Sequence, residues 1–203
     1  MPIQNFTSGI LQNNNYLVWD EDTLEAVLID CSAPNQDIID FIHEKELHLK
    51  FILLTHGHFD HIMGVDFFQE KLKVKAYLNK EDKPLVDNFN TALDRFHLPK
   101  MPAPKINHFF GKDTPFFLGK EKIKIFTTPG HTKGGTCFFI QNCLFSGDTL
   151  FYGSYGRTDF SESNPQEMQK SLKFLFQQFP NTTLVYPGHG PATTIEKERP
   201  LYE

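Results

Sequence analysis

The sequence predicts an α/β fold in which buried strands alternate with amphipathic helices, and three observations carry that prediction. Short apolar runs rich in valine, leucine and isoleucine recur along the chain between polar breaks. Several of the intervening segments place apolar residues at helical spacing. Four of the apolar runs end in breaks that are rich in glycine or proline and carry histidine or aspartate. In open sheets flanked by helices, ligands usually bind at such strand ends.

The first half of the chain has the clearest alternation of strands and helices. Each expected strand is an apolar run bounded by polar residues, and each expected helix has apolar residues three or four positions apart. The helix near residue 38 has Ser32 or Asn35 as its possible N-cap. In order, we expect strands at 15–19 and 25–29, a helix at 38–47, a strand at 49–54, a helix at 62–72 and a strand at 74–78.

Between residues 79 and 104 the pattern weakens. Phe89, Leu93 and Phe96 are spaced for a short helix, and three prolines between residues 99 and 104 then exclude regular structure. We interpret residues 79–104 as a connecting insertion. A contribution to a lid over the site is the alternative to ordinary packing between the two halves.

The second half is predicted to return to strands, followed by one long helix. That helix begins at Pro165, with Asn164 as its N-cap and proline at the first helical position. The expected elements are strands at 106–110, 116–118, 123–127, 136–140 and 144–146, a helix at 165–179 and a strand at 183–186.

Composition limits the classes of protein and partner. A chain of 203 residues can bury a substantial core as one domain or as two tightly fused halves. The formal charge of -5 and pI near 6.0 argue against a broad basic face, so we expect no nucleic-acid partner. The sequence shows no signal-peptide pattern and no apolar run of membrane-spanning length, so we expect a soluble cytoplasmic protein that does not contact the membrane.

The three cysteines are Cys31, Cys137 and Cys143. They form no Cys-x-x-Cys pair, and their odd number suits a reducing compartment better than a disulfide framework. We expect core or near-core thiols with no nucleophilic role.

Residues 53–61 contain the most informative stretch of the chain. Successive side chains of an extended backbone point to opposite faces, so His56, His58 and Asp60 are expected on one side. His61 follows where the chain turns into a helix, and it can reach the same space from another direction. A histidine-rich surface loop is the alternative interpretation, and further ligands elsewhere in the chain decide against it.

Those further ligands are His131, Asp148 and His189, each just past another predicted strand. Together with the first loop they supply five imidazoles and two carboxylates, enough for two divalent cations with open positions for water. Such a donor set suits zinc, which we expect first, or iron or manganese. A structural zinc site would more often use cysteine thiolates, and no cysteine lies in these loops. The site is therefore predicted to be catalytic.

Four motifs carry these residues: Thr55-His56-Gly57-His58-Phe59-Asp60-His61, Pro129-Gly130-His131-Thr132, Gly147-Asp148 and Pro187-Gly188-His189-Gly190. Together they resemble the metallo-β-lactamase fold superfamily of metal-dependent hydrolases, and the resemblance covers nearly the whole chain. It implies a four-layer αββα sandwich with a dinuclear centre at one edge between the two sheets. It also implies that Asp148 bridges two metals, the first held by His56, His58 and His131 and the second by Asp60, His61 and His189.

Within that superfamily, residues 147–151, 156–160 and 188–195 resemble the short, single-domain glyoxalase II-like enzymes, which are hydroxyacylglutathione hydrolase-like. β-Lactamases of the main class carry a cysteine where this chain has Asp148, which disfavours that activity. Classical glyoxalase II has an additional C-terminal helical domain that helps to bind glutathione. We expect none here, with residues 1–203 forming a single domain, so recognition of glutathione is left open.

The predicted reaction is hydrolysis of a hydroxyacyl thioester such as S-lactoylglutathione, a small-molecule substrate. Two cations about 3.5 Å apart can share a water, supply hydroxide at neutral pH and polarise a carbonyl. Asp60 is expected to orient this nucleophile as well as to bind metal, which makes it the predicted catalytic residue. A thiolate leaves without a strong general acid, so a thioester suits the site.

Three residues of one glycine-rich loop are candidates for binding the substrate. Arg157 can grip a carboxylate through paired hydrogen bonds, although a structural pair with Asp159 is an equally good interpretation. Tyr152 and Tyr155 are expected to line the pocket, with a surface position as the alternative.

A persulfide dioxygenase is the rival from another reaction class. That branch also resembles this chain at residues 156–160, and it would hold one iron with His56, His131 and Asp148. A hydrolase of another small ester or lactone is a further alternative. A binding protein with a degenerate site is disfavoured because the ligand set is complete. The sequence does not indicate the oligomeric state.

Overall fold

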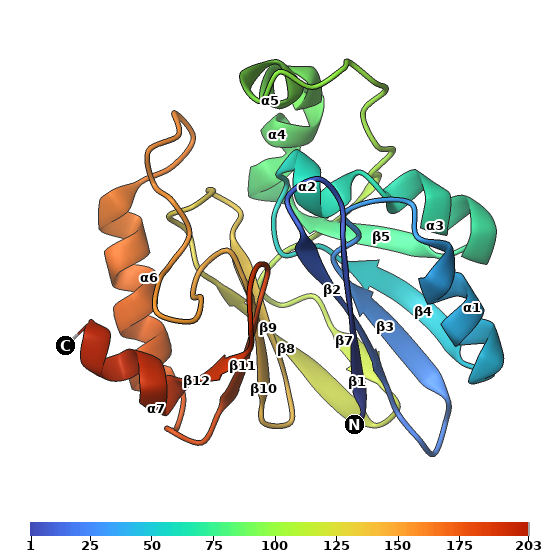
Figure 1. Cartoon of the computed structure of the whole chain (residues 1–203). Coiled ribbons are helices and arrows are strands. Elements are labelled where there is room, and N and C mark those ends of the chain that lie inside the picture. Colours follow the sequence, from blue (N-terminus) through green and yellow to red (C-terminus); the bar gives the residue numbers. More distant parts are fainter. Residues whose placement is uncertain (203) are drawn as a thin grey trace.

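The computed structural model describes residues 1–202, and its framework is two six-stranded sheets packed face to face (Figure 1). In the first sheet the strands follow chain order. The first three are antiparallel neighbours, and the pairs from β3 to β6 are parallel. The strands are β1 (Ile3–Ser8), β2 (Asn13–Trp19), β3 (Glu25–Ile29), β4 (His48–Leu53), β5 (Lys75–Asn79) and β6 (His108–Phe110).

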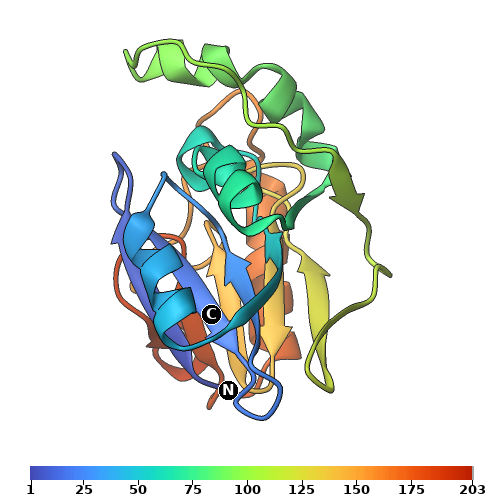
Figure 2. The ribbon, with the colours of Figure 1, turned by 90° about the vertical axis from the view of Figure 1, so that its right-hand side faces the viewer.

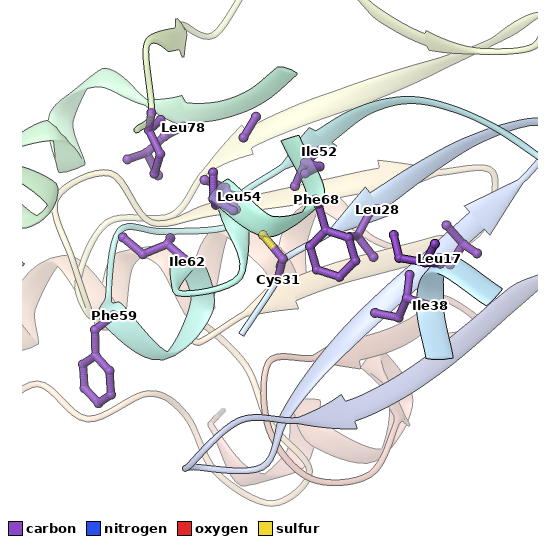
Figure 3. Close-up of a cluster of buried hydrophobic side chains, with 14 of the residues drawn as sticks. Leu17, Leu28, Cys31, Ile38, Ile52, Leu54, Phe59, Ile62, Phe68 and Leu78 are labelled. Carbon is purple, nitrogen blue, oxygen red and sulfur yellow. The ribbon is translucent and has the colours of Figure 1, made fainter. Parts of the chain in front are cut away.

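Helices α1 (Gln36–Glu44) and α3 (Val65–Leu72) cover the outer face of this sheet (Figure 2). The Asn35 side chain caps α1 by accepting a hydrogen bond from the Asp37 N–H, so Asn35 rather than Ser32 is the cap. Figure 3 shows the resulting core, in which strand residues such as Leu28 and Ile52 meet helix residues such as Ile38 and Phe68.

The second sheet has the order β12-β11-β10-β9-β8-β7. Its neighbours are antiparallel except for β10 and β11, which run parallel because α6 (Pro165–Gln178) connects them. The Asn164 side chain caps α6, and Pro165 is its first residue, as predicted. The strands are β7 (Phe116–Leu118), β8 (Glu121–Thr127), β9 (Thr136–Ile140), β10 (Cys143–Gly147), β11 (Leu184–Pro187) and β12 (Thr193–Thr194).

Three apolar cores lie between four layers, so the predicted αββα sandwich is confirmed. One core lies under α1 and α3, and one lies between the two sheets around residues such as Phe138 and Phe145. The third lies between the second sheet and α6, where Leu172 and Leu175 meet Leu144. α7 (Ile195–Glu198) and the turn η2 (Arg199–Leu201) complete that outer layer. Over residues 1–202, no helix combines the length and apolar character needed to cross a bilayer.

Several short elements differ from the prediction. The helix expected at 62–72 is two helices, α2 (Phe59–Ile62) and α3, because the chain turns at Gly64, which packs against the backbone of Ala33. Strand β1 was not predicted, since only Ile3 and Phe6 of its six residues are apolar and they do not alternate with the polar ones. The two-residue strand β12 and the one-turn helix α7 were also missed, because neither is long enough to show periodicity.

The insertion contains more helix than its pattern indicated. It forms η1 (Lys80–Asp82), α4 (Lys83–Asp87) and α5 (Phe89–Arg95), of which only the last was predicted. Residues 98–107 then contain no helix or strand, as the prolines predicted. α4 and α5 project from the edge of the sandwich near α2 (Figures 1 and 2).

Candidate metal centre

The predicted ligands meet at one edge of the sandwich because they follow four strands whose ends lie together there. His56 and His58 follow β4, and the loops after β8, β10 and β11 bring His131, Asp148 and His189. The backbone stays extended only as far as His58, which is the N-cap of α2. Asp60 therefore reaches the site from the first turn of a helix, and the alternation expected through residue 60 was wrong at its last position.

All seven predicted ligands lie in three overlapping groups. Within each group, one ligand atom from every residue lies within 4.8 Å of the others. Six of the seven side chains are at most about one-tenth exposed, and His189 is the most open. The groups are His56, His58 and His131; His56, His61 and Asp148; and Asp60, His61 and His189.

Three of the buried ligand atoms have no hydrogen-bond partner within the described protein. They are Nε2 of His56, Nε2 of His61 and Oδ1 of Asp148, of which the last two face one another at 3.4 Å without the geometry of a hydrogen bond. Leaving such a group unpaired costs about 1–3 kcal/mol, so native proteins rarely do so without a reason. Imidazole nitrogen and carboxylate oxygen are also the donors that zinc and iron accept. The residues present therefore fit divalent metal ions.

On each imidazole the outer nitrogen has a hydrogen-bond partner, and this directs the other ring nitrogen into the site. The acceptors hold the outer N–H, and in a neutral ring this leaves a lone pair on the nitrogen that faces the site. In four of the five rings the outer nitrogen is Nδ1. Nδ1 of His56 contacts Thr55 Oγ1 (3.1 Å), and Nδ1 of His61 contacts Asp30 Oδ2 (2.8 Å). Nδ1 of His131 contacts the Arg157 carbonyl (2.7 Å), and Nδ1 of His189 contacts the Leu11 carbonyl (3.1 Å).

Asp30 is a partner that the sequence analysis missed. Its carboxylate accepts hydrogen bonds from the backbone N–H and the hydroxyl of Thr55, both at 2.8 Å, as well as from His61. Asp30 is itself a carboxylate directly after a buried strand, β3. The signal that identified Asp148 could therefore have identified Asp30.

Asp148 lies between the two sides of the site. Its Oδ1 is 3.4 Å from His61 Nε2, and its Oδ2 is 3.4 Å from His131 Nε2. Burial alone would raise the pKa of Asp148, but the surrounding imidazoles outweigh it and bring the pKa to about 2. Asp148 is therefore an anion positioned to face a cation on either side.

The Asp60 carboxylate is held by Asn13, whose Nδ2 donates a hydrogen bond to Asp60 Oδ2 at 2.9 Å. Burial raises the pKa of Asp60, and the nearby His61 and His189 lower it further than burial raises it. The net pKa lies below the ordinary range, so Asp60 is ionised.

The imidazoles differ in their affinity for protons. Burial lowers the pKa of His56 well below its usual value and that of His131 to about 4. For His61, burial also favours the neutral ring, but Asp148, Asp30 and Asp60 outweigh it and raise the pKa. The first two rings are thus neutral at pH 7 and ready to donate a lone pair, whereas His61 holds a proton that a metal ion must displace.

Asp82, from the insertion, ties two ligand loops together. Its Oδ2 accepts hydrogen bonds from the Gly57 N–H (2.9 Å) and the Thr132 hydroxyl (2.8 Å), and its Oδ1 accepts one from the Gly134 N–H (2.6 Å). Gly57 lies between two predicted ligands, and Thr132 directly follows His131. No local sequence signal marks Asp82, because its partners lie 25 to 52 residues away.

A cavity of about 430 Å³ opens above the predicted ligands. Its floor includes Asp60 and Asp148, and its walls are mainly apolar. The wall residues are Leu11, Phe59, Ala92, Arg95, Phe96, Phe151, Ser154, Tyr155, Arg157 and Phe160. The insertion contributes to this cavity through the end of α5.

The three predicted substrate residues have different positions. Tyr155 and Arg157 line the cavity, whereas Tyr152 does not and is 57% exposed. The Arg157 guanidinium pairs with Asp159 through contacts of 2.7 and 2.6 Å and lies 4.3 Å from the centre of the Phe160 ring. The structure thus contains the Arg157–Asp159 pair expected if Arg157 has a structural role. It also places Arg157 at the cavity, as expected if Arg157 binds the substrate.

Comparison with known proteins agrees with this geometry. A family model described as "Metallo-beta-lactamase superfamily" matches residues 8–189. The hydroxyacylglutathione hydrolase GloC of Haemophilus influenzae is 31% identical over 192 residues, which cover 93% of this chain and 90% of the relative.

Solved structures of similar size have the same fold. The BLEG-1 B3 metallo-beta-lactamase superposes with a TM-score of 0.89 at 30% identity, covering 98% of this chain and 97% of the other. TTHA1623 in a di-iron-bound form gives 0.86 at 34% identity, with coverages of 97% and 96%. ETHE1 from Myxococcus xanthus gives 0.80 at 26% identity, covering 100% of this chain and 83% of the other. The chain belongs to the metallo-beta-lactamase superfamily of metal-dependent hydrolases.

Proposed function

We propose that this metallo-hydrolase cleaves a thioester of the hydroxyacylglutathione type. The observation that carries the proposal is the convergence of seven ligand side chains, several with unpartnered buried donor atoms, at the base of one cavity that five of them line. His56, His58 and His131 would hold one divalent ion, and Asp60, His61 and His189 a second. Asp148 would bridge the two. Zinc is the first expectation, and the di-iron relative makes iron the main alternative.

The bound ions would supply an activated water and a Lewis acid for the substrate carbonyl. The chain's own residues provide the rest. Asn13 holds Oδ2 of Asp60, which leaves Oδ1 free to orient a water molecule and accept its proton. The aromatic wall excludes bulk water and strengthens each electrostatic contact inside the cavity.

The choice of a thioester is supported by the relative GloC and by the lack, among the described residues that line the cavity, of a carboxyl group or imidazole beyond the predicted metal ligands. Besides the predicted metal ligands, the titratable side chains that line the cavity are Arg95, Tyr155 and Arg157. Neither arginine can donate a proton readily at neutral pH. A thiolate needs no such donor, whereas a poor leaving group would need one.

The test is a substrate panel on one metal-loaded preparation. S-Lactoylglutathione and other thioesters should release thiol, with turnover lost after chelation and restored by the metal. Small esters and a lactone are included because they are the alternative substrates of a metallo-hydrolase, and a β-lactam is included because one of the similar structures is a β-lactamase. Turnover of none of the thioesters by protein carrying two metal ions per chain would refute the proposal.

Arg157 can be tested in the same assay. If it binds an anionic group of the substrate, Arg157→Ala raises KM several-fold for S-lactoylglutathione and much less for a thioester without carboxylates. If Arg157 serves only its pair with Asp159, both KM values stay unchanged and at most a small loss of stability appears.

A persulfide dioxygenase is the second candidate, favoured by the similarity to ETHE1 over the whole chain. In that case His56, His131 and Asp148 would hold a single iron. One iron per chain, with oxygen consumption on glutathione persulfide and no thioester turnover, would decide for it.

A further inference from the structure

Glu162 lies behind His58, on the side away from the other ligands. His58 Nδ1 faces His131 Nε2 at 2.8 Å, and His58 Nε2 is 3.3 Å from Glu162 Oε1. Both side chains are largely buried, with exposures of 8% for His58 and 18% for Glu162. Of the five imidazoles in the site, His58 and His61 are the two whose outer nitrogen meets a side-chain carboxylate from a different loop, Glu162 for His58 and Asp30 for His61.

The hydrogen bonds around this pair fix the direction of each ring. Nδ1 of His131 donates to the Arg157 carbonyl, so its Nε2 carries a lone pair. An N–H on His58 Nε2 donates to Glu162, which leaves a second lone pair on His58 Nδ1. The two nitrogens point at one another at 2.8 Å, and this arrangement is favourable only with a proton or a metal ion between them.

Glu162 is in turn held by the insertion. Arg95, the last residue of α5, donates to both of its oxygens at 2.8 and 3.3 Å, and the Ser161 hydroxyl donates at 2.9 Å. The Arg95 guanidinium therefore places a permanent positive charge against the Glu162 carboxylate and fixes its orientation. The Phe160 ring packs beside the Arg95, Glu162 and His58 side chains, with its centre 4.8 Å from the Arg95 guanidinium carbon and 5.5 Å from the centre of the His58 ring.

We propose that Glu162 is a positioning residue of the metal centre, and that Arg95 places it so that His58 presents Nδ1 to the metal. The inference rests on the proposed role of His58 as a ligand, and it is independent of the substrate. A carboxylate on the outer nitrogen also makes the imidazole more basic, which strengthens its bond to a metal ion.

The experiment measures Zn²⁺ affinity by competition with a chromophoric chelator, without any substrate. Glu162→Ala should weaken one of the two stepwise binding constants by on the order of 10–100-fold, the usual effect of removing such a partner. The other constant should change by less than about threefold, because the hydrogen-bond partners of the other metal ion's ligands are unchanged. Glu162→Gln keeps an acceptor oxygen without the charge, so it should recover part of the loss.

Glu167→Ala is the matched control, because Glu167 pairs only with Lys170 on the surface of α6, a few residues along the chain. It should leave both constants unchanged. Arg95→Gln should weaken the same constant as Glu162→Ala, and the double variant should show no further loss, because Arg95 acts through Glu162. The visible spectrum of the Co²⁺-loaded protein should change in Glu162→Ala and remain that of wild type in the control.

Two outcomes would overturn the inference. In one, both constants of Glu162→Ala stay at wild-type values. In the other, both constants fall equally and in step with a loss of stability in the metal-free protein, which would make Glu162 a structural residue. His58→Ala tests separately whether His58 is a metal ligand. If His58→Ala also leaves both constants unchanged, the proposed role of His58 as a ligand is wrong. If it weakens one of them, His58 is a ligand, and the results for Glu162→Ala then bear on the inference about Glu162 alone.

Discussion

Asp82→Asn should weaken both the fold and the metal site, because Asp82 joins the loop after β4 to the loop after β8. Both carboxylate oxygens are occupied by donors: Gly57 and Thr132 on one, and Gly134 on the other. An asparagine can offer only one oxygen. If that oxygen stays with the first pair, the new NH₂ group faces the N–H of Gly134, so two buried donors are left unpaired.

The magnitude follows from those two donors. Each unpaired buried group costs about 1–3 kcal/mol, which gives a gross loss of about 2–6 kcal/mol. Removal of a buried charge offsets part of this loss, since burial raises the pKa of Asp82 in spite of its three donors. We therefore expect a net loss of about 2–4 kcal/mol in the free energy of unfolding. For a chain of this size, that corresponds to a fall in Tm of about 4–16 °C.

The assay is urea unfolding of the metal-free protein, followed by the fluorescence of the single tryptophan, Trp19, which packs against Phe41. Asp87→Asn is the control, because Asp87 forms only an exposed ion pair with Lys83 within α4, the helix that directly follows Asp82. It should change stability by less than about 0.5 kcal/mol. If Asp82→Asn stays within that range too, the role assigned to the three hydrogen bonds is refuted. Zinc affinity should fall in the same variant, since both ligand loops are released.

Three further predictions concern the same framework. Gly188→Ala should greatly weaken metal binding, since a Cβ there would collide with the Asp148 carboxylate and the His61 ring, whereas Gly111→Ala meets open space; equal affinities would contradict this. Zinc affinity should rise with pH by up to about tenfold per unit below the raised pKa of His61, because binding releases its proton; calorimetry in two buffers at pH 7 would detect that proton, and pH-independent binding would disprove the assignment. In the native protein a thiol reagent should modify Cys143 alone, since the other two thiols are fully buried and Cys143 is partly exposed; rapid modification of more than one cysteine per folded chain would be inconsistent.

The ligands were predictable because each one has a local signal. His131, Asp148 and His189 follow apolar strands directly, and the chain marks each break with glycine or proline. Strand ends of one sheet edge lie together, so a reader of the sequence can expect these residues to meet. The same reasoning located the long helix at Pro165, where the N-cap and the proline both precede a clear helical spacing.

The partners behind the ligands were not predictable in this way. His58 and Glu162 are 104 residues apart, and Thr132 and Asp82 are 50 apart. Periodicity tells which face of an element is buried, but it does not tell which polar residue of another loop meets it. Such pairings depend on loop conformations, and these carry no repeating pattern. The departure of Asp60 from the expected alternation has a similar cause, because α2 is a single turn of helix that shows no period of its own.

The insertion, residues 79–104, therefore does more than connect the two halves of the chain, because it also contributes to the site. Asp82 at its start and Arg95 at the end of α5 both reach groups that lie behind the ligands, whereas Ala92 and Phe96 line the cavity itself. A segment that formed only a lid would touch the mouth of the cavity and leave the ligands unaffected. Because this segment contacts both, a displacement of α5 would alter the support of His58 together with the width of the cavity.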